Sequence, residues 1–168
     1  MHLGTTLTFF DTETTIAKDT LLDTVPVLCK QYEVEFEVLL TTLGNMANII
    51  HLTIGGNGDQ YGDRTPGVWL YQKGKLRIDS AVNGDHKYTY KPSTNLVAGQ
   101  WIKFNIAQVR LVSGEYQFTI QLDGKEVHRV KNTDAREFKN VKIYASSPWL
   151  DAQPGKIRNL LIVNAGNI

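Results

Sequence analysis

Apolar and polar residues alternate with a period of two along most of this chain, and this pattern constrains the fold more than any other feature. From Tyr32 to Val38 every second residue is apolar, and glutamates lie between them. Trp101 to Gln108 and Tyr116 to Leu122 alternate in the same way, and Thr5 to Phe10 is rich in β-branched and aromatic residues. Successive side chains of a β-strand point to opposite faces, so each segment predicts a strand with one buried face. No long segment has a 3.6-residue apolar period, so we expect no substantial helix.

Turn residues separate the predicted strands at short intervals. Asp123-Gly124 lies between two alternating segments and is typical of a hairpin whose central residues both need positive φ. Lys73-Gly74 and Asn83-Gly84-Asp85 give similar signals, and further strands are expected from Asn140 to Ala145 and from Lys156 to Val163. Many short strands at spacings of roughly 8–12 residues indicate an all-β fold, either an antiparallel sandwich or a barrel. We expect one domain over residues 1–168, since no repeat or linker is visible.

Composition excludes several classes of protein. With 168 residues, a net charge of +1 and 42% hydrophobic residues, the chain suits a globular domain and does not suit a disordered protein. The balanced charge argues against nucleic acid as a partner, and the lack of an apolar run of about 18 residues argues against membrane insertion. Cys29 is the only cysteine, which excludes an intrachain disulfide and a multi-cysteine zinc site. The first residues do not resemble a signal peptide, so a cytosolic location and a secreted one both stay open.

The segment from Ile49 to Val82 contains the strongest candidates for function. It predicts three strands, and a glycine-rich polar loop from Gly55 to Gly67 joins the first two. Alternate residues such as Ile50 and Leu52 are expected in the core. The opposite face combines an aromatic ring with hydrogen-bonding groups, as a polar, ring-shaped ligand requires. The residues expected on that outward face are His51, Thr53, Trp69, Tyr71, Arg77 and Asp79.

The other candidate site is a rim of loops at one end of the sandwich. We expect the rim to bind the ligand, with the sheet face as a possible extension, because glycine-rich loops can bring backbone donors close to a ligand. If consecutive strands run antiparallel, the loops 55–66, 83–87, 112–115 and 132–138 gather there. The polar residues expected at this rim are Asp59, Asp63, Arg64, Asn83, Asp85, Asn132 and Asp134. No cofactor is required, but carboxylate oxygens suit Ca²⁺, so Asp59, Asp63 and Asp85 are candidate calcium ligands. The alternative is that these residues only form turns, or that Asp63 and Arg64 are a buried structural pair.

Several short motifs resemble a known superfamily. They are Asn48–Thr53, Asp63–Trp69, Gly99-Gln100-Trp101, the Asp123-Gly124 hairpin and Val141–Ser146. Together with the hydrophobic pattern, they resemble the concanavalin A-like jelly-roll superfamily, and within it the laminin-G-like and galectin-like domains of animal extracellular proteins. The resemblance implies a two-sheet jelly-roll sandwich, an extracellular location and a lectin role, with glycans or glycoproteins as partners and a homo-oligomer as an option. The alternative is an adhesion or assembly module that binds a protein partner.

The resemblance also bears on the tryptophans and on the outward face. Galectin-like sites resemble the outward set, with His, Arg, Asn and Trp on a concave sheet, although Leu52-Thr53 after His51 departs from that family's spacing. Trp69 either contributes to such a site or caps the edge of the core. Trp101 is expected in the core. Trp149, in a proline-bounded loop, either offers its ring for stacking or covers the end of the sandwich.

Enzymatic activity is not expected. Glu33, Glu35 and Glu37 share one face of a strand, which superficially fits the paired carboxylates of glycan hydrolases. No aspartate lies between them, and a solvated face or a protected edge strand explains them equally well. The chain also lacks the spacing of a catalytic serine triad and a phosphate-binding loop.

Overall fold

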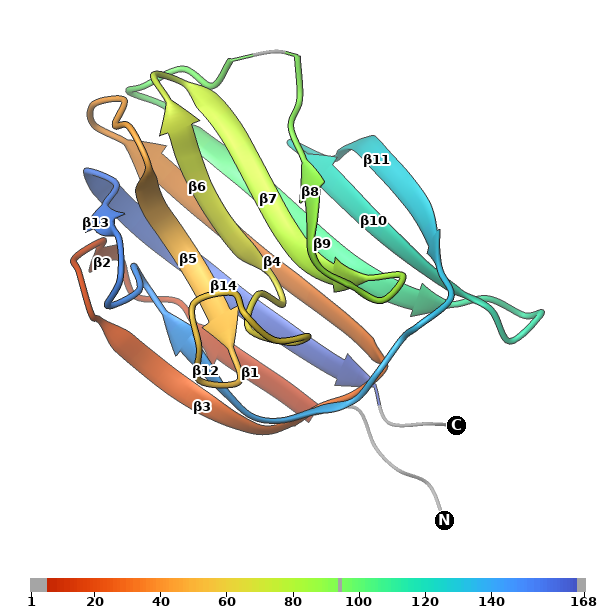
Figure 1. Ribbon diagram of the computed structural model, residues 1–168. Helices are drawn as coiled ribbons and strands as arrows, with labels where there is room; N and C mark the ends of the chain where they lie inside the picture. Colours follow the sequence, from red (N-terminus) through yellow and green to blue (C-terminus); the bar gives the residue numbers. More distant parts are fainter. Residues whose placement is uncertain (1–5, 94, 166–168) are drawn as a thin grey trace.

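The computed structural model describes residues 6–93 and 95–165, and within these ranges it contains fourteen β-strands and no helix. The strands form two sheets of seven strands, which stack face to face (Figure 1). Almost all pairings are antiparallel. The predicted all-β, two-sheet sandwich is therefore confirmed. The described part of the chain has no helix long and apolar enough to cross a membrane.

The two sheets bring together strands that are distant in sequence. Sheet A contains, in spatial order, β1 (Thr6–Phe10), β14 (Gly155–Ala165), β4 (Gln31–Leu40), β9 (Trp101–Arg110), β10 (Tyr116–Leu122) and β11 (Lys125–Asn132), with β2 (Thr14–Thr15) beside β14. Sheet B contains β3 (Leu21–Leu28), β12 (Phe138–Tyr144), β5 (Ala47–Thr53), β6 (Gly67–Gln72), β7 (Lys75–Val82) and β8 (Asp85–Tyr90), with β13 (Asp151–Ala152) beside β5. This order is that of a jelly roll.

The hydrophobic core lies between the sheets and follows from the alternation in the sequence. In β4 the apolar residues are buried, and the glutamates between them lie half-buried on the outer face of sheet A. Phe36 of β4 stacks on Phe104 of β9, with 4.9 Å between ring centroids. Full burial of such a side chain stabilises the fold by about 1.5–3 kcal/mol. The core therefore fixes which residues of every strand face outward.

Three strands differ from expectation. The sequence pattern does not predict β3, because Pro26 lacks the N–H that a central strand needs; β3 pairs only with β12, so the proline lies in an edge strand. Strand β8 begins at Asp85, inside a segment expected to be only a turn. The glutamate strand β4 lies between β14 and β9, so its interpretation as a protected edge is wrong.

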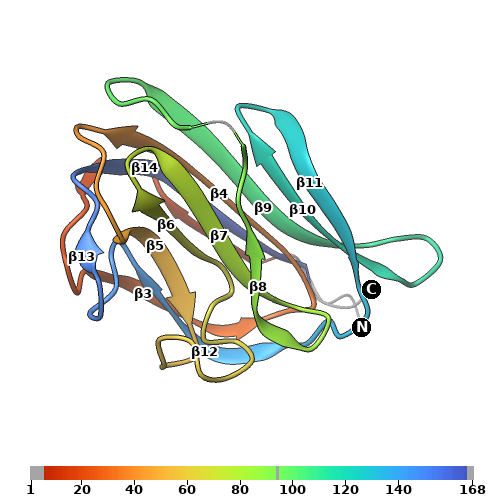
Figure 2. The ribbon, with the colours of Figure 1, turned by 45° about the horizontal axis from the view of Figure 1, so that its top comes forward.

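The loops gather at the two ends of the sandwich as predicted. At one end, the Asn83 side chain accepts a hydrogen bond from the backbone N–H of Thr133 (2.7 Å), and the Tyr61 hydroxyl donates to the Asp134 carbonyl (2.6 Å). Figure 2 shows the 55–66 loop and the β7–β8 turn at this same end. At the other end, the loops before β9 and after β6 are joined by a backbone hydrogen bond. The alternating direction of consecutive strands therefore predicts correctly at which end of the sandwich these loops lie.

Candidate functional site

The 55–66 loop is organised by one buried carboxylate. Asp63 accepts hydrogen bonds from the backbone N–H groups of Gly56 (3.1 Å), Asp59 (2.9 Å) and Gln60 (2.9 Å). A Cβ at Gly56 would lie 2.4 Å from this carboxylate, so the close approach requires glycine. Both oxygens of Asp63 are therefore used inside the loop, and the expectation that Asp63 presents its carboxylate at an open rim is wrong.

Arg64 leaves this loop and folds back over the outer face of sheet B. Its Nη1 donates to Asp79 Oδ2 (2.5 Å), while Nε and Nη2 of Arg77 each donate to Asp79 (2.9 Å). The Thr89 hydroxyl adds a fourth hydrogen bond (2.8 Å). Asp79 lies on the outer face of sheet B but is 0% exposed, because the 55–66 loop covers it. The expectation that Asp79 and Arg64 meet solvent is wrong, because parity gives the face of a residue and not what covers it.

His51 lies on the same face and is 1% exposed. Its Nε2 is 2.6 Å from the carbonyl oxygen of Asp63. A carbonyl only accepts, so Nε2 carries the proton and donates. Burial lowers the pKa of His51 to about 4, which keeps the ring neutral at pH 7. Its buried Nδ1 has no hydrogen-bond partner among the described residues.

A row of packed rings and a guanidinium group crosses the outer face of sheet B. Trp149 meets His51 edge to face with 5.4 Å between ring centroids, and His51 lies 6.3 Å from Trp69. The Arg77 guanidinium lies 5.3 Å from the Trp69 ring. We call Trp149, His51, Trp69 and Arg77 the aromatic row. Trp69 lies across Gly67, where a Cβ would stand 2.5 Å from the ring.

Only the ends of the aromatic row reach solvent. Trp149 is 36% exposed and the Arg77 side chain is 24% exposed, whereas His51 and Trp69 are buried. Of the two alternatives for Trp149, the structure shows a partly exposed ring that also covers His51. Sequence reasoning thus selects the right face, but it does not show that Trp149, from a distant loop, completes it.

The rim residues Asn83, Asn132 and Asp134 do come together. The Asn132 side chain accepts from the backbone N–H groups of Asn83 (2.9 Å) and Asp134 (3.0 Å). Arg136 forms two hydrogen bonds with the Asp134 carboxylate and lies 4.3 Å over the Tyr61 ring. This hydrogen bonding holds the pKa of Asp134 below its usual value. The described contacts of this rim tie its turns to one another.

The three candidate calcium ligands do not form one carboxylate group in the described part of the chain. Asp59 and Asp85 are exposed, and the Asp63 carboxylate is occupied by three backbone donors. Asp85 accepts from the backbone N–H of Lys87 (2.8 Å). Within residues 6–93 and 95–165, no group of three or more His, Cys, Asp or Glu side chains is placed to hold a metal ion.

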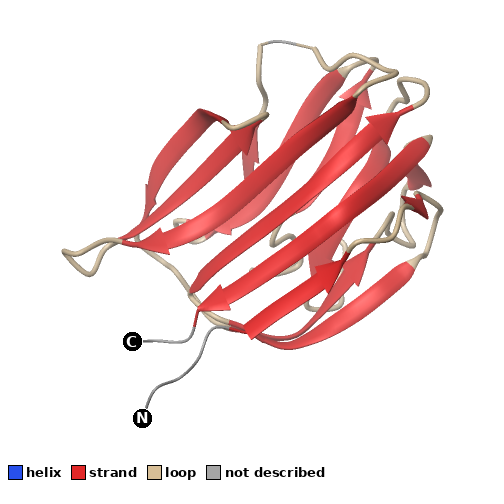
Figure 3. Cartoon of the chain, turned by 180° about the vertical axis from the view of Figure 1, so that it is seen from behind, coloured by secondary structure: helices blue, strands red, loops and turns tan. Residues whose placement is uncertain are grey.

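No loop crosses the outer face of sheet A (Figure 3). The middle of this face, on β4 and β9, carries charged side chains. Trp101 lies on this face, half-buried, with the Arg158 guanidinium 3.8 Å from its ring. The prediction that Trp101 lies in the core is wrong. Ile102 and Phe104 point into the core, so Trp101, which alternates with them along β9, points outward. Lys103 and Arg158 pair with glutamates of β4 at 2.9 Å and 3.2 Å. The carboxylates of this face are therefore used in cross-strand pairs.

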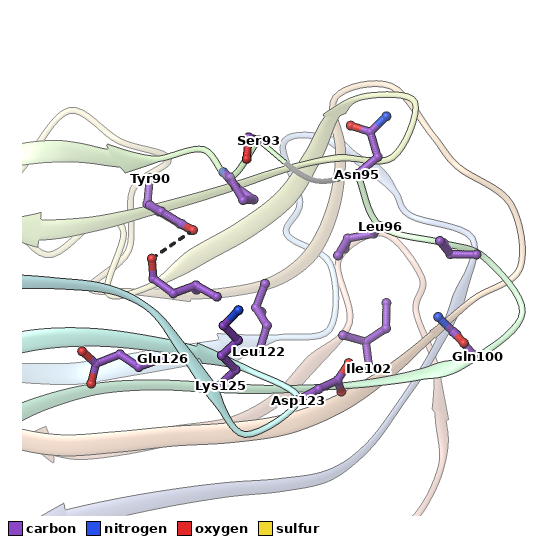
Figure 4. A pocket seen from close by; sticks show the side chains of 13 residues that line it. Tyr90, Ser93, Asn95, Leu96, Gln100, Ile102, Leu122, Asp123, Lys125 and Glu126 are labelled. Atoms are coloured by element: carbon purple, nitrogen blue, oxygen red, sulfur yellow. Dashed lines mark hydrogen bonds between the residues drawn. The ribbon is translucent and has the colours of Figure 1, made fainter.

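A cavity of about 490 Å³ opens at the end of the sandwich away from the 55–66 loop (Figure 4). The Tyr90 hydroxyl donates to the Val127 carbonyl (3.4 Å) across it. Apolar side chains such as Leu96 and Leu122 line it, and Lys125 lies at the β10–β11 hairpin beside it. None of the residues predicted to bind a ligand line this cavity.

Three lysines accompany Arg77 and Tyr71 on sheet B, and the sequence analysis does not name them as candidates. They are Lys75, Lys87 and Lys91. The Lys91 Nζ lies 4.7 Å from the Tyr71 ring. A signal for them exists in the sequence, because Lys75 has the parity of Arg77, and Lys87 and Lys91 share one parity in the next strand.

Comparison with known proteins identifies similar structures, whereas no protein-family model and no curated protein matches the chain. A heptameric SAP-like pentraxin from Limulus polyphemus is 11% identical, with a TM-score of 0.56 over 92% of this chain and 75% of that one. The Emp47p carbohydrate recognition domain is 7% identical, with a TM-score of 0.53 over 96% and 89%. Domain 4 of the extracellular arabinanase AbnA from Geobacillus stearothermophilus, solved with arabinotriose, is 14% identical, with a TM-score of 0.51 over 93% and 84%. The fold is the concanavalin A-like jelly roll.

Proposed function

We propose that this protein is a non-enzymatic carbohydrate-binding protein, a lectin, that holds glycans on the outer face of sheet B. The observation that carries the proposal is the aromatic row, whose ends Trp149 and Arg77 reach solvent on one sheet face. Aromatic rings stack on the C–H faces of sugars, and a guanidinium donates several hydrogen bonds in a fixed fork. The carbohydrate-binding domains among the similar structures support this assignment.

The face is held in place before any ligand binds. Two nitrogens of Arg77 are held by buried Asp79, and its Nη1 has no hydrogen-bond partner in the described part of the chain. Trp149 packs against His51 and Tyr144. Groups that are already fixed lose little conformational entropy on binding, so a modest number of contacts gives measurable affinity.

Catalysis is not part of the proposal. The carboxylates nearest to a hydrolase arrangement, Glu35 and Glu37, lie on the other sheet and pair with Lys103 and Arg158. The proposal includes an extracellular location, where glycans of other cells and of the matrix are accessible.

A glycan array with two matched tryptophan variants tests the proposal. Trp149→Ala removes the exposed ring of the aromatic row, and Trp101→Ala removes a half-buried ring from the outer face of sheet A. We expect the array signal of Trp149→Ala to fall about tenfold or more, as loss of about 1.4 kcal/mol implies, and that of Trp101→Ala to stay near wild type. Thermal melting of both variants confirms that they fold. No glycan bound by the wild type, or equal losses in the two variants, would contradict the proposal.

An assembly module is the second candidate, and one observation favours it. Leu7 and Phe9 of the edge strand β1 are 62% and 56% exposed, and they lie opposite Val163 and Leu161 of β14. Exposed apolar side chains on an unpaired edge favour pairing with another strand, here the β1 of a second copy. Sedimentation of the wild type and of Phe9→Lys at several concentrations tests this: a dimer that dissociates in the variant supports assembly, and a monomer in both excludes it.

A further inference from the structure

We infer that the glycan is acidic and that its carboxylate or sulfate groups bind a basic surface on β7 and β8. This surface consists of Lys75, Arg77, Lys87 and Lys91, and we call it the basic surface. The inference rests on the proposed function and specifies the chemical class of the ligand.

The strand register places these four cations on one face. Asp79 of β7 lies opposite Thr89 of β8, so residues of the same parity in the two strands share a side of the sheet. In β8 the alternation is strict: Lys87 and Thr89 are exposed, while the tyrosines between them are half-buried toward the core. Residues two apart on a strand are separated by about 7 Å and neighbouring strands by about 4.8 Å. Lys91, directly after β8, therefore lies near Arg77, and the four cations form a stripe about 20 Å long with Lys75 and Lys87 at its two ends.

The three lysines of the basic surface are not neutralised by ion pairs with described residues, and Arg77 shares the single carboxylate of Asp79 with Arg64. Lys75, Lys87 and Lys91 form no ion pair with a described residue, whereas Lys103 and Lys131 of sheet A each pair with a glutamate. The carboxylate of Asp79 lies between two guanidinium groups. A cluster of like charges without counter-charges is destabilising, and an anionic ligand removes that repulsion.

Aromatic rings within the basic surface favour an acidic sugar over other anions. Lys91 lies 4.7 Å from the Tyr71 ring, and Arg77 lies 5.3 Å from the Trp69 ring. Half-exposed Tyr71 therefore offers an aromatic ring beside Lys91, which suits a ligand with both C–H faces and acidic groups. The net charge of only +1 does not favour a nucleic acid.

Two pairs of polymers test the class of ligand. Polygalacturonate is compared with its fully methyl-esterified form, and dextran sulfate with dextran, so that each pair differs in its acidic groups. We expect the acidic member of at least one pair to bind, and its affinity to fall about tenfold or more between about 50 mM and about 500 mM sodium chloride. The pair that responds identifies the acidic group as carboxylate or sulfate.

Two triple variants with equal charge loss locate the site. Lys75→Ala/Lys87→Ala/Lys91→Ala removes three charges from the basic surface. The control Lys30→Ala/Lys125→Ala/Lys139→Ala removes three exposed lysines elsewhere. We expect the first variant to lose about tenfold or more in affinity and the control to change less than about twofold, since distant charges are screened.

Three outcomes would overturn the inference. They are equal binding of the acidic and neutral polymers, equal losses in the two triple variants, and displacement of the acidic polymer by polyadenylate at the same charge concentration. If neutral glycans bind in a Trp149-dependent manner while both acidic polymers fail, the acidic class is wrong and the lectin role stands. If no glycan of either kind binds, both proposals fall.

Discussion

At the scale of single residues, the outer face of sheet B depends on Asp79. Its carboxylate is fully buried and accepts four hydrogen bonds from the side chains of Arg64, Arg77 and Thr89. Burying an ion is costly unless its partners are close and well oriented, and here two guanidinium forks meet that condition. Trp69 lies under both guanidinium groups, so the position of the ring depends on the same carboxylate.

Asp79→Asn removes the charge and keeps the size of this side chain. We expect a loss of about 3–5 kcal/mol in the free energy of unfolding, because the mostly buried Arg64 and the partly exposed Arg77 then lose their shared counter-charge. Asp85→Asn is the matched control, since Asp85 is exposed, and we expect a change within about 0.5 kcal/mol. Urea denaturation measures both. If Asp79→Asn and Asp85→Asn changed the free energy of unfolding equally little, Asp79 would be solvated rather than buried.

His51 makes stability depend on pH. Burial holds its pKa at about 4 in the folded protein, below the ordinary value of 6.5, so the unfolded chain binds a proton first as the pH falls. The folded state therefore loses stability as the pH falls from about 6.5 toward 4, by on the order of 2–3 kcal/mol at pH 4.5. His51→Gln keeps a donor for the Asp63 carbonyl but does not titrate.

Urea denaturation of both proteins at about pH 7 and about pH 4.5 checks this expectation. Carboxylates that titrate in the same range affect both proteins alike, so the wild type should lose about 2–3 kcal/mol more than His51→Gln. An equal loss in the two proteins would mean that His51 is protonated in the folded state.

At the scale of elements, the 55–66 loop determines what the sheet face presents. Tyr61 packs the loop against Phe138, and Asp63 binds three backbone N–H groups inside the loop. Arg64 follows directly, so the conformation of the loop also positions the guanidinium over the sheet. A rigid loop is thus a condition for the aromatic row.

Two aspartates of this loop provide a matched test. Asp63→Ala leaves three backbone donors without an acceptor, and we expect the melting temperature to fall by about 5–15 °C, as a loss of about 2–4 kcal/mol implies for a chain of this size. Asp59→Ala, whose exposed side chain forms no hydrogen bond within the described chain, should melt within about 2 °C of the wild type. Similar melting temperatures for the two variants would exclude a structural role for the Asp63 carboxylate.

The sequence predicts more of the strands than of the site. The alternation in β4 and β9 identifies both strands and their inward faces, and strand parity gathers Asn83 with Asn132. Parity also places His51 and Asp79 on the outward face. It does not reveal that the 55–66 loop folds back over them, because that depends on Arg64 finding Asp79 across the sheet.

Other differences have equally local causes. Trp101 is the first residue of β9 and lies on the face opposite to Ile102. The alternation in the sequence therefore already indicates that Trp101 points outward, and only its aromatic side chain favours the core. Strand β3 is not predicted because Pro26 is compatible only with an edge strand. Whether a strand lies at an edge depends on how the whole sheet is assembled, which the local sequence does not show. Trp149 joins the aromatic row from a loop almost a hundred residues from His51, a contact that no local pattern contains.

At the scale of the whole molecule, the two outer faces of the sandwich differ in charge. On sheet A, lysines and arginines pair with glutamates across the strands. On sheet B, Arg77 of the basic surface pairs with the buried Asp79, but Lys75, Lys87 and Lys91 form no ion pair with a described residue, although the whole chain carries a net charge of only +1. The two faces therefore offer different surfaces to a ligand, and the aromatic row lies on the basic one.

The most direct test of glycan binding on sheet B is a ¹H–¹⁵N NMR titration of the wild-type protein with a short oligogalacturonate. We predict shift changes confined to β6, β7, β8 and the loop around Trp149, where the aromatic row and the basic surface lie. Amides of β4 and β9, whose side chains face the opposite side of the sandwich, should not move. Shift changes centred on β4 and β9, or none at saturating oligosaccharide, would contradict the account.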